Sequence, residues 1–201
     1  MLDSVSLMPP VDDERLATSV RAGDREAFEA VVHAYLGQIV RAARGAGLDA
    51  HDAEDVAQST FATFMEVSHR FEGRSSVRTF LFGILYKKIA EARRQIRKAQ
   101  RFDAIDHVVE GRFEADGSWQ RPPLPIDLKL QDAEIRGAID GCLERVSSQQ
   151  RMAFVLREVE DFDTVEICKI LDVSRTNLGV LLYRARNRLR ECLEEKVVRG
   201  T

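Results

Sequence analysis

The chain has 201 residues, of which 44% are hydrophobic and 31% charged, and its net charge is −3. This length and composition allow one large or two small soluble domains. The N-terminal stretch MLDSVSLMPPVDDERL lacks the basic start and apolar run of a signal peptide, and no apolar run approaches the roughly 20 residues that span a bilayer. We therefore expect a cytosolic protein without membrane insertion.

The three cysteines, Cys142, Cys168 and Cys192, are far apart in sequence and form no C-x-x-C pair. This spacing predicts reduced, buried, small hydrophobic side chains rather than a disulfide or a zinc site. The four histidines form no ligand pattern, and no P-loop, nucleophile elbow or H-E-x-x-H is present. The sequence thus argues against an enzyme and predicts neither a metal nor a cofactor.

Charge is distributed unevenly along the chain. Residues 70–101 carry 10 basic and 2 acidic side chains, and residues 175–190 carry five arginines and no acid. The segments before, between and after these two are net negative. Two cationic segments separated by an acidic one indicate two contacts with an anionic partner, of which DNA or RNA is the first candidate.

Helical patterns dominate the N-terminal hundred residues. In DREAFEAVVHAYLGQIVRAARG, apolar residues repeat at spacings of three and four, with Asp24 as the expected N-cap and Gly45 or Gly47 at the end. DAEDVAQSTFATFMEVSHRF predicts a second helix with Asp52 as its cap candidate. The acids at its start satisfy free amides and the helix dipole, or equally dock a basic partner helix.

A turn, FEGRSS (71–76), precedes a long helix expected from about Val77 to Ala99. On a helical wheel this helix has an apolar side and a cationic ridge formed by Lys87, Arg94, Lys98 and Arg101. Such a ridge suits a phosphate backbone, although a solvated helix face has the same pattern. Nearby aromatic residues, including Phe71, can stack unpaired bases, but most are better explained as core residues. The better candidates for polar contact with a displaced base lie in the turn: Arg74, Ser75 and Ser76.

Residues 102–130 contain three prolines, two glycines and a surplus of acid, which predicts a linker. Helical spacing returns at about Gln131. The expected fold is all-α, with two small helical domains at 14–101 and 131–196 joined by the acidic linker. A tether of this kind permits either packing or separation of the two domains.

Near the C-terminus, TVEICKIL, DVS and RTNLGVLLYRAR predict a helix, a three-residue turn and a second helix capped by Ser174. Asp172 stands where glycine is usual in such a turn and tolerates a left-handed backbone. On the second helix, Asn177, Arg184 and Arg188 lie away from the apolar stripe formed by Leu178, Leu182, Ala185 and Leu189. This is a helix-turn-helix whose second helix fits a major groove; the alternative is a helical hairpin with a solvated arginine face.

In chain order, DREAFEAVVHAY, DAEDVAQSTF, FEGRSSVRTFLFGILYKKIAEARR, an acidic linker and LREVEDFDTVEICKILDVSRTNLGVLLYRARNRLR resemble a bacterial sigma factor. The resemblance covers about residues 15–195 and is to the small extracytoplasmic-function (ECF) group of the sigma-70 family, which has only regions two and four. It implies a cytoplasmic factor that binds core RNA polymerase, recognises promoter DNA and helps to open its strands. Its last helix is similar to that of a subgroup often encoded beside a zinc-binding anti-sigma protein.

The resemblance also implies roles for individual residues. Contact with core polymerase, through its β′ clamp helices, falls on Asp52, Glu54, Asp55, Gln58 and Phe61; the β flap is a further implied contact of the factor. Contact with the minus-ten element falls on Phe71, Arg74, Ser75, Ser76, Lys87, Glu91 and Arg94; Lys98 joins this DNA-binding set as part of the cationic ridge. Contact with the minus-thirty-five element falls on Arg175, Thr176, Asn177, Arg184 and Arg188. The chain departs from the family at Lys87, where Asn is common, at Phe80, where Trp is common, and at Gly179, where a basic residue is frequent.

Two other classes of protein compete with this interpretation. A free-standing helix-turn-helix regulator explains residues 164–190 but leaves residues 52–101 without a function. An adaptor or anti-activator would use the acidic helices to bind proteins only, and would tolerate charge reversal at Arg184 and Arg188.

Overall fold

The computed structural model describes residues 13–99, 139 and 141–199, with the backbone alone at the helix ends 13, 95–99 and 196–199. All regular structure within these residues is helical, so the all-α prediction is confirmed. The expected linker at 102–130 lies outside the described residues, as does the start of the helical stretch expected from Gln131.

The N-terminal half (residues 13–99) contains four α-helices and one turn of 3-10 helix: α1 (Asp13–Arg21), α2 (Arg25–Gly45), α3 (Ala50–Val67), η1 (Ser68–Arg70) and α4 (Val77–Ala99). As predicted, Asp24 caps α2, and its carboxylate accepts the backbone N–H of Glu26 at 2.9 Å. The cap predicted at Asp52 is wrong. Asp49 caps α3 instead and accepts the backbone N–H of Asp52 at 2.8 Å, which places Asp52 in the first helical turn.

The core of the N-terminal half is built from α2, α3 and α4, which all contact one another. Its centre is a chain of aromatic rings from three helices and the loop before α4. Phe64 meets Phe28 edge to face with ring centroids 5.8 Å apart, and Phe80 lies 6.1 Å from Phe64 and 5.0 Å from Phe71. Such aromatic pairs contribute more than their buried area alone.

The C-terminal half (residue 139 and residues 141–199) begins with helical residues 141–143 and continues with α6 (Ser148–Phe154), the π-helical segment η3 (Val155–Val159), α7 (Thr164–Leu171) and α8 (Arg175–Arg199). The predicted helix-turn-helix is present as α7 and α8. Asp172 is left-handed with φ 54°, and the Ser174 hydroxyl oxygen accepts the backbone N–H of Asn177 at 3.2 Å. The predicted apolar stripe of α8 is buried: Leu178, Leu182, Ala185 and Leu189.

Cys142 and Cys192 form a disulfide with their Cα atoms 5.6 Å apart, so the prediction of three reduced cysteines is wrong for this pair. Both lie in a small apolar cluster with Ile139, Leu143, Val146, Phe154, Ala185 and Leu189. The pair is separated by 50 residues in sequence, and it meets because α8 runs back beside the start of the C-terminal half. Cys168 is a free, half-buried thiol.

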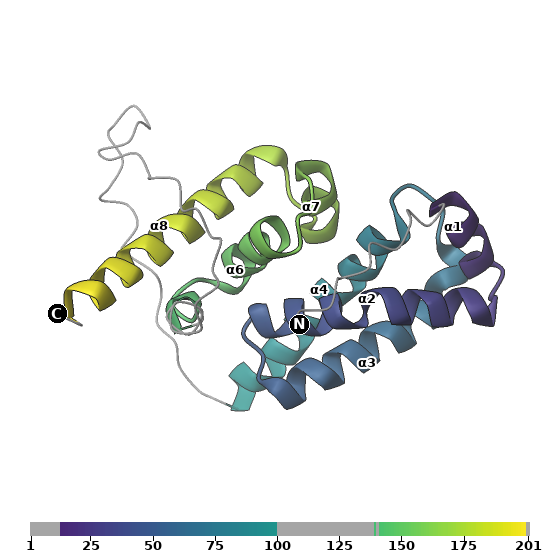
Figure 1. Cartoon of the computed structure of the whole chain (residues 1–201), viewed down its shortest axis with the longest axis horizontal. Helices are drawn as coiled ribbons and strands as arrows, with labels where there is room; N and C mark the ends of the chain where they lie inside the picture. The colour runs from purple at the N-terminus through teal and green to yellow at the C-terminus, as the bar shows by residue number, and fades with distance from the viewer. Residues whose placement is uncertain (1–12, 100–138, 140, 200–201) are drawn as a thin grey trace, which may run out of the picture.

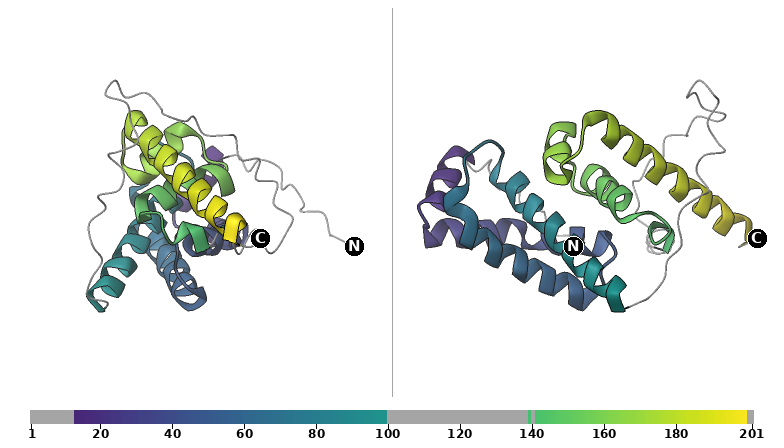
Figure 2. Two further views of the ribbon diagram at one scale, coloured as in Figure 1. Left: turned by 90° about the vertical axis from the view of Figure 1, so that its left-hand side faces the viewer. Right: turned by 180° about the vertical axis from the view of Figure 1, so that it is seen from behind.

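The two halves share a core: of the two arrangements that the linker was expected to permit, packing and separation, the structure has packing. The larger apolar cluster continues from α2 and α4 into Met152, Leu156, Phe162 and Ile167 of the C-terminal half. Figure 1 shows α7 lying against α4, and the Phe82 and Phe162 rings meet here with centroids 4.7 Å apart. Figure 2 shows α3 and α8 on the sides turned away from this contact.

Candidate nucleic-acid interface

Loop 71–76 connects η1 to α4, and its serine side chains are held by local hydrogen bonds. The Ser76 hydroxyl oxygen accepts the backbone N–H of Thr79 at 3.0 Å and shares a 2.8 Å hydrogen bond with the Thr79 hydroxyl. The Ser75 hydroxyl donates to the carbonyl of Ser76 at 3.3 Å. By contrast, the Arg74 side chain is 82% exposed and pairs with Glu72. Arg74 is therefore the side chain that this loop presents most openly to an anionic ligand.

Phe71 and Phe61 lie in the core. Phe71 is 3% exposed and packs on Phe80, so its ring supports loop 71–76 from beneath. Phe61 is 7% exposed on the inner side of α3. Both rings are thus core residues, whereas several of the site residues predicted beside them in sequence are exposed.

The described part of the α4 ridge is exposed as predicted. Lys87, Glu91 and Arg94 are all exposed and follow one another at spacings of four and three, which places them on one helix face. Glu91 also pairs with Lys88 at 3.7 Å. The side chain of Lys98, and Arg101 altogether, lie outside the described residues. The apolar side of the helix is buried through Leu81, Leu85 and Ile89.

The acidic start of α3 forms a second exposed surface. Glu54, Asp55 and Gln58 are exposed, and Asp52 is half-buried. His51 lies 3.7 Å from Asp55, one helical turn away. Three carboxylates near a helix N-terminus are stabilised by the helix dipole and remain available to a cationic partner.

The residues of α8 predicted to contact DNA fall into two groups by their exposure. Arg175, Thr176 and Asn177 form the exposed first turn of the helix, which is the part that enters a major groove in helix-turn-helix proteins. Arg188 donates to the carbonyl of Arg145 at 3.2 Å, and Arg184 is half-buried with no hydrogen-bond partner at Nε. Both lie further along α8 than the exposed turn, and both are partly buried in the C-terminal half.

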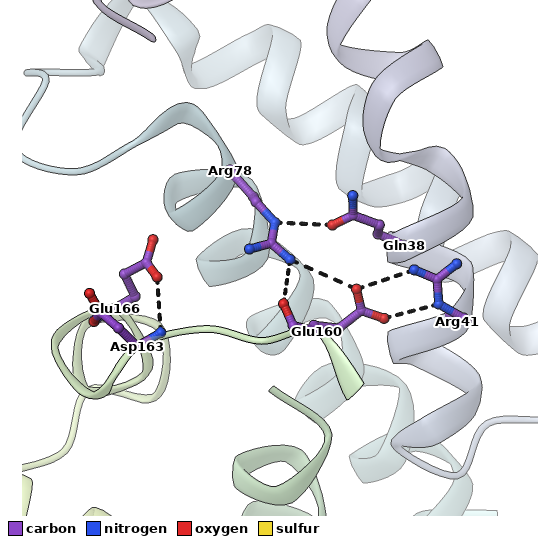
Figure 3. A network of polar contacts seen from close by, with 6 residues as sticks. All are labelled: Gln38, Arg41, Arg78, Glu160, Asp163 and Glu166. Atoms are coloured by element: carbon purple, nitrogen blue, oxygen red, sulfur yellow. Dashed lines mark hydrogen bonds and ion pairs between the residues drawn. The ribbon is translucent and has the colours of Figure 1, made fainter. Parts of the chain in front are cut away.

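A polar network that the sequence did not predict joins the two halves (Figure 3). Glu160, whose side chain is 2% exposed, accepts hydrogen bonds from Arg41 at 3.2 and 3.3 Å. Arg78 donates to Gln38 at 3.0 Å and to the carbonyl of Glu160 at 2.6 Å. We call Gln38, Arg41, Arg78 and Glu160 the interdomain network.

Arg78 is the centre of this network. Its guanidinium lies 3.8 Å from the centroid of the Phe162 ring, a cation–π distance. Burial lowers the pKa of Arg78 because a desolvated cation is less stable, and the nearby carboxylate of Glu160 opposes that shift. A sequence signal existed: Arg78 stands among apolar residues at the start of α4, where a buried guanidinium is normally paired with an acid. The partner, 82 residues away, could not be identified from sequence.

The structure gives no indication of a metal site or a membrane span in the part of the chain that it describes. Its His, Cys, Asp and Glu side chains form no group of three or more that could hold a metal ion. None of the described helices is both long and apolar enough to cross a bilayer.

Comparison with protein families matches both halves of the chain. Residues 31–102 match the model of sigma-70 region 2, and residues 136–189 match the model of sigma-70 region 4. The first match contains the α3 acids, loop 71–76 and α4, and the second contains the helix-turn-helix up to Leu189.

Individual relatives extend this similarity to nearly the whole chain. RNA polymerase sigma-H factor of Pseudomonas aeruginosa is 27% identical over 188 residues, which is 90% of this chain and 94% of that protein. ECF RNA polymerase sigma-E factor of Escherichia coli is 27% identical over 190 residues, covering 92% and 94% of the two chains. Among solved structures, CnrH in complex with the cytosolic domain of CnrY has a TM-score of 0.67 at 21% identity, covering 91% of this chain and 97% of that one. RpoE in complex with the anti-sigma factor NepR from Bartonella quintana has a TM-score of 0.61 at 22% identity, covering 83% and 96%. These two structures establish a shared fold.

Proposed function

We propose that this chain, which belongs to the sigma-70 family of RNA polymerase sigma factors as a member of the ECF type, uses separate exposed surfaces for core polymerase and for the two promoter elements. A sigma factor binds core RNA polymerase and directs it to promoter DNA. One observation supports this assignment: each matched family region contains one of the two arginine-rich helices, α4 in the first and α8 in the second.

The α4 ridge and loop 71–76 contact the minus-ten element. Opening duplex DNA costs about 1.4 kcal/mol per stacked step, so strand separation needs compensating contacts. Lys87 and Arg94 supply cations for one strand backbone, and Arg74 lies beside the position of an extruded base. The buried ring of Phe71 fixes the floor of the loop.

The exposed first turn of α8 contacts the minus-thirty-five element. Arg175, Thr176 and Asn177 provide side chains that hydrogen-bond base edges or phosphates, and all three are exposed. Arg184 and Arg188 contribute positive charge further along the helix. The helix surface is open at Gly179, because no atom lies within 4 Å of a Cβ built there. A longer side chain would fit at this position.

The acids of α3 contact core polymerase. Glu54, Asp55 and Gln58 are exposed on a helix that turns away from the contact between the halves. An anti-sigma protein is a further partner, supported by the solved complex of a similar chain, RpoE, with the anti-sigma factor NepR. We infer a cytoplasmic, non-enzymatic regulator of transcription, as this function requires neither a metal nor a cofactor.

The test is run-off transcription with core polymerase on DNA from upstream of this protein's own gene. We expect a discrete start that depends on the protein and falls at least about tenfold in Arg94→Glu or Arg175→Glu, since each reversal replaces attraction to phosphate by repulsion. Asp55→Arg is expected to lose co-elution with core polymerase on gel filtration.

Arg25→Glu is the matched control, because Arg25 is an exposed arginine outside both cationic segments. It should transcribe like the unmodified protein. Failure to co-elute with core polymerase, together with tight promoter binding by the protein alone, would instead favour a free-standing helix-turn-helix regulator.

A further inference from the structure

The side of α8 that faces away from the protein core is uncharged. At about 100° per residue, the buried side chains of this helix gather on one side: Leu178, Leu181, Leu182, Ala185 and Leu189. The residues within about 40° of the opposite direction carry no charge: Thr176, Val180, Tyr183 and Asn187. We call these residues the outer strip of α8. Its exposed members are Thr176 and Val180.

Arginines stand on both flanks of the outer strip. Arg175 and Arg186 lie on one flank, and Arg184 and Arg188 lie on the other. Arg186 also pairs with Glu158. A helix with its side chains is about 10–12 Å across, and the major groove of DNA is about 12 Å wide. If the outer strip points at the base pairs, the arginines of each flank therefore lie beside one of the two phosphate backbones.

Val180 is the exposed apolar member of the outer strip. Its side chain is 40% exposed, and among the exposed large hydrophobic side chains of the described residues it is the one that lies on α8. In the major groove only thymine presents a methyl group, and apolar side chains contact that methyl. A valine in a helix has one strongly preferred χ1 rotamer, so its methyl groups are fixed before DNA binds and little side-chain entropy is lost on contact.

The residue before Val180 leaves room for a base pair to approach. Gly179 is exposed, and the open space around it means that packing within the protein does not require a glycine there. A glycine weakens the interior of a helix relative to alanine. With no side chain at this position, a base-pair edge can come closer to the methyl groups of Val180 than it could beside a longer neighbour.

We propose that Val180 is a specificity-determining residue, which reads the 5-methyl group of one thymine in the minus-thirty-five element while the flanking arginines hold the phosphate backbones. The inference rests on the proposed function, because it takes α8 as the helix that contacts this element. An arginine that reads a base does so by hydrogen bonds to guanine, whereas Val180 makes the contacted position prefer thymine.

Removal of a single methyl group tests the proposal. The minus-thirty-five element upstream of the protein's own gene is first located by footprinting the complex of core polymerase with this protein. Each thymine of the element is then replaced in turn by deoxyuridine, which keeps the base pairing and lacks only the 5-methyl group. At one thymine the Kd of the complex for the promoter should rise about fourfold, the equivalent of about 0.8 kcal/mol for one buried methyl group.

The variant Val180→Ala assigns this effect to its side chain. It should bind the thymine promoter about as weakly as the unmodified protein binds the deoxyuridine promoter, and deoxyuridine should then cause no further loss. Val165→Ala is the matched control, because Val165 is the same residue type and is 42% exposed, but lies on α7. This control should keep the fourfold difference between the two promoters.

Three results would overturn the proposal. They are the absence of a methyl effect at every thymine of the element, a methyl effect that persists in Val180→Ala, and loss of the effect in Val165→Ala as well. Val180 is exposed and alanine favours a helix, so Val180→Ala should remain folded, which circular dichroism checks. Failure of the proposed function is distinct, because the unmodified protein would then give neither a footprint nor a start with core polymerase.

Discussion

The two halves of the molecule are stabilised in different ways. In the N-terminal half, α2, α3 and α4 contact one another around the rings of Phe28, Phe64 and Phe80, which all belong to this half. The C-terminal half divides its apolar side chains between two places. Phe162 and Ile167 join the core of the N-terminal half, whereas Phe154 and Leu189 surround the Cys142–Cys192 disulfide.

This difference indicates which half depends on contacts beyond the packing of its own helices. The ring contacts among Phe28, Phe64, Phe71 and Phe80 are made within the N-terminal half alone. The C-terminal half depends on two supports outside its own helix packing, the contact with α2 and α4 and the disulfide. The disulfide ties α8 to the start of the C-terminal half independently of the contact with α2 and α4.

The largest expected effect is at the aromatic core of the N-terminal half. Phe64 is 1% exposed and contacts the rings of Phe28 and Phe80, so Phe64→Ala leaves a cavity and should lower the free energy of unfolding by about 3–5 kcal/mol. Urea unfolding followed by circular dichroism measures this loss.

The neighbouring residue provides the control for Phe64→Ala. Met65 is 55% exposed on the same helix, so Met65→Ala should change the free energy of unfolding by less than about 0.5 kcal/mol. Similar losses in both variants would contradict a core centred on Phe64.

The next effect concerns the disulfide of the C-terminal half. Replacing both Cys142 and Cys192 by alanine should lower the free energy of unfolding by about 2–4 kcal/mol, because the bond closes a long loop and restricts the unfolded chain. Cys168→Ala, at the free thiol, should not reproduce the loss of the bond. Thiol counting gives an independent check: one reactive thiol is expected in unfolded, unreduced protein and three after reduction, and three without reduction would show that the bond is absent.

Much of the helical framework could be predicted from the sequence because its signals are local. Asp24 caps α2, Ser174 caps α8, and the apolar stripe from Leu178 to Leu189 is buried, all as expected from spacing. The cap of α3 was predicted at the wrong residue because Asp49 and Asp52 are equally good caps in sequence, whereas the helix begins at Ala50.

The remaining features depend on contacts between residues far apart in the chain. Neither the pairing of Cys142 with Cys192 nor that of Arg78 with Glu160 leaves a local pattern, since each needs two helices to be placed first. For the same reason the predicted site residues differ in exposure: Arg74 and Arg175 are exposed, whereas Phe61 and Phe71 belong to the core. Periodicity identifies which residue types gather on a face, and only tertiary packing determines whether that face is covered.

The smallest effect tests the turn of the helix-turn-helix, where Asp172 has a left-handed backbone. Asp172 has φ 54° and ψ 53°, a left-handed conformation in which a Cβ costs roughly 1–2 kcal/mol. Asp172→Gly should therefore raise the free energy of unfolding by up to about 1 kcal/mol, and Asp172→Val should lower it by about as much, because a β-branched side chain resists this conformation. Asp163→Gly is the control, since Asp163 has φ −74° and caps α7, so glycine there gains nothing and loses the capping box. If glycine destabilised the protein equally at both positions, the Asp172 side chain rather than the backbone would determine the shape of the turn. The C-terminal half would then contain one more side-chain contact that sequence spacing alone does not predict.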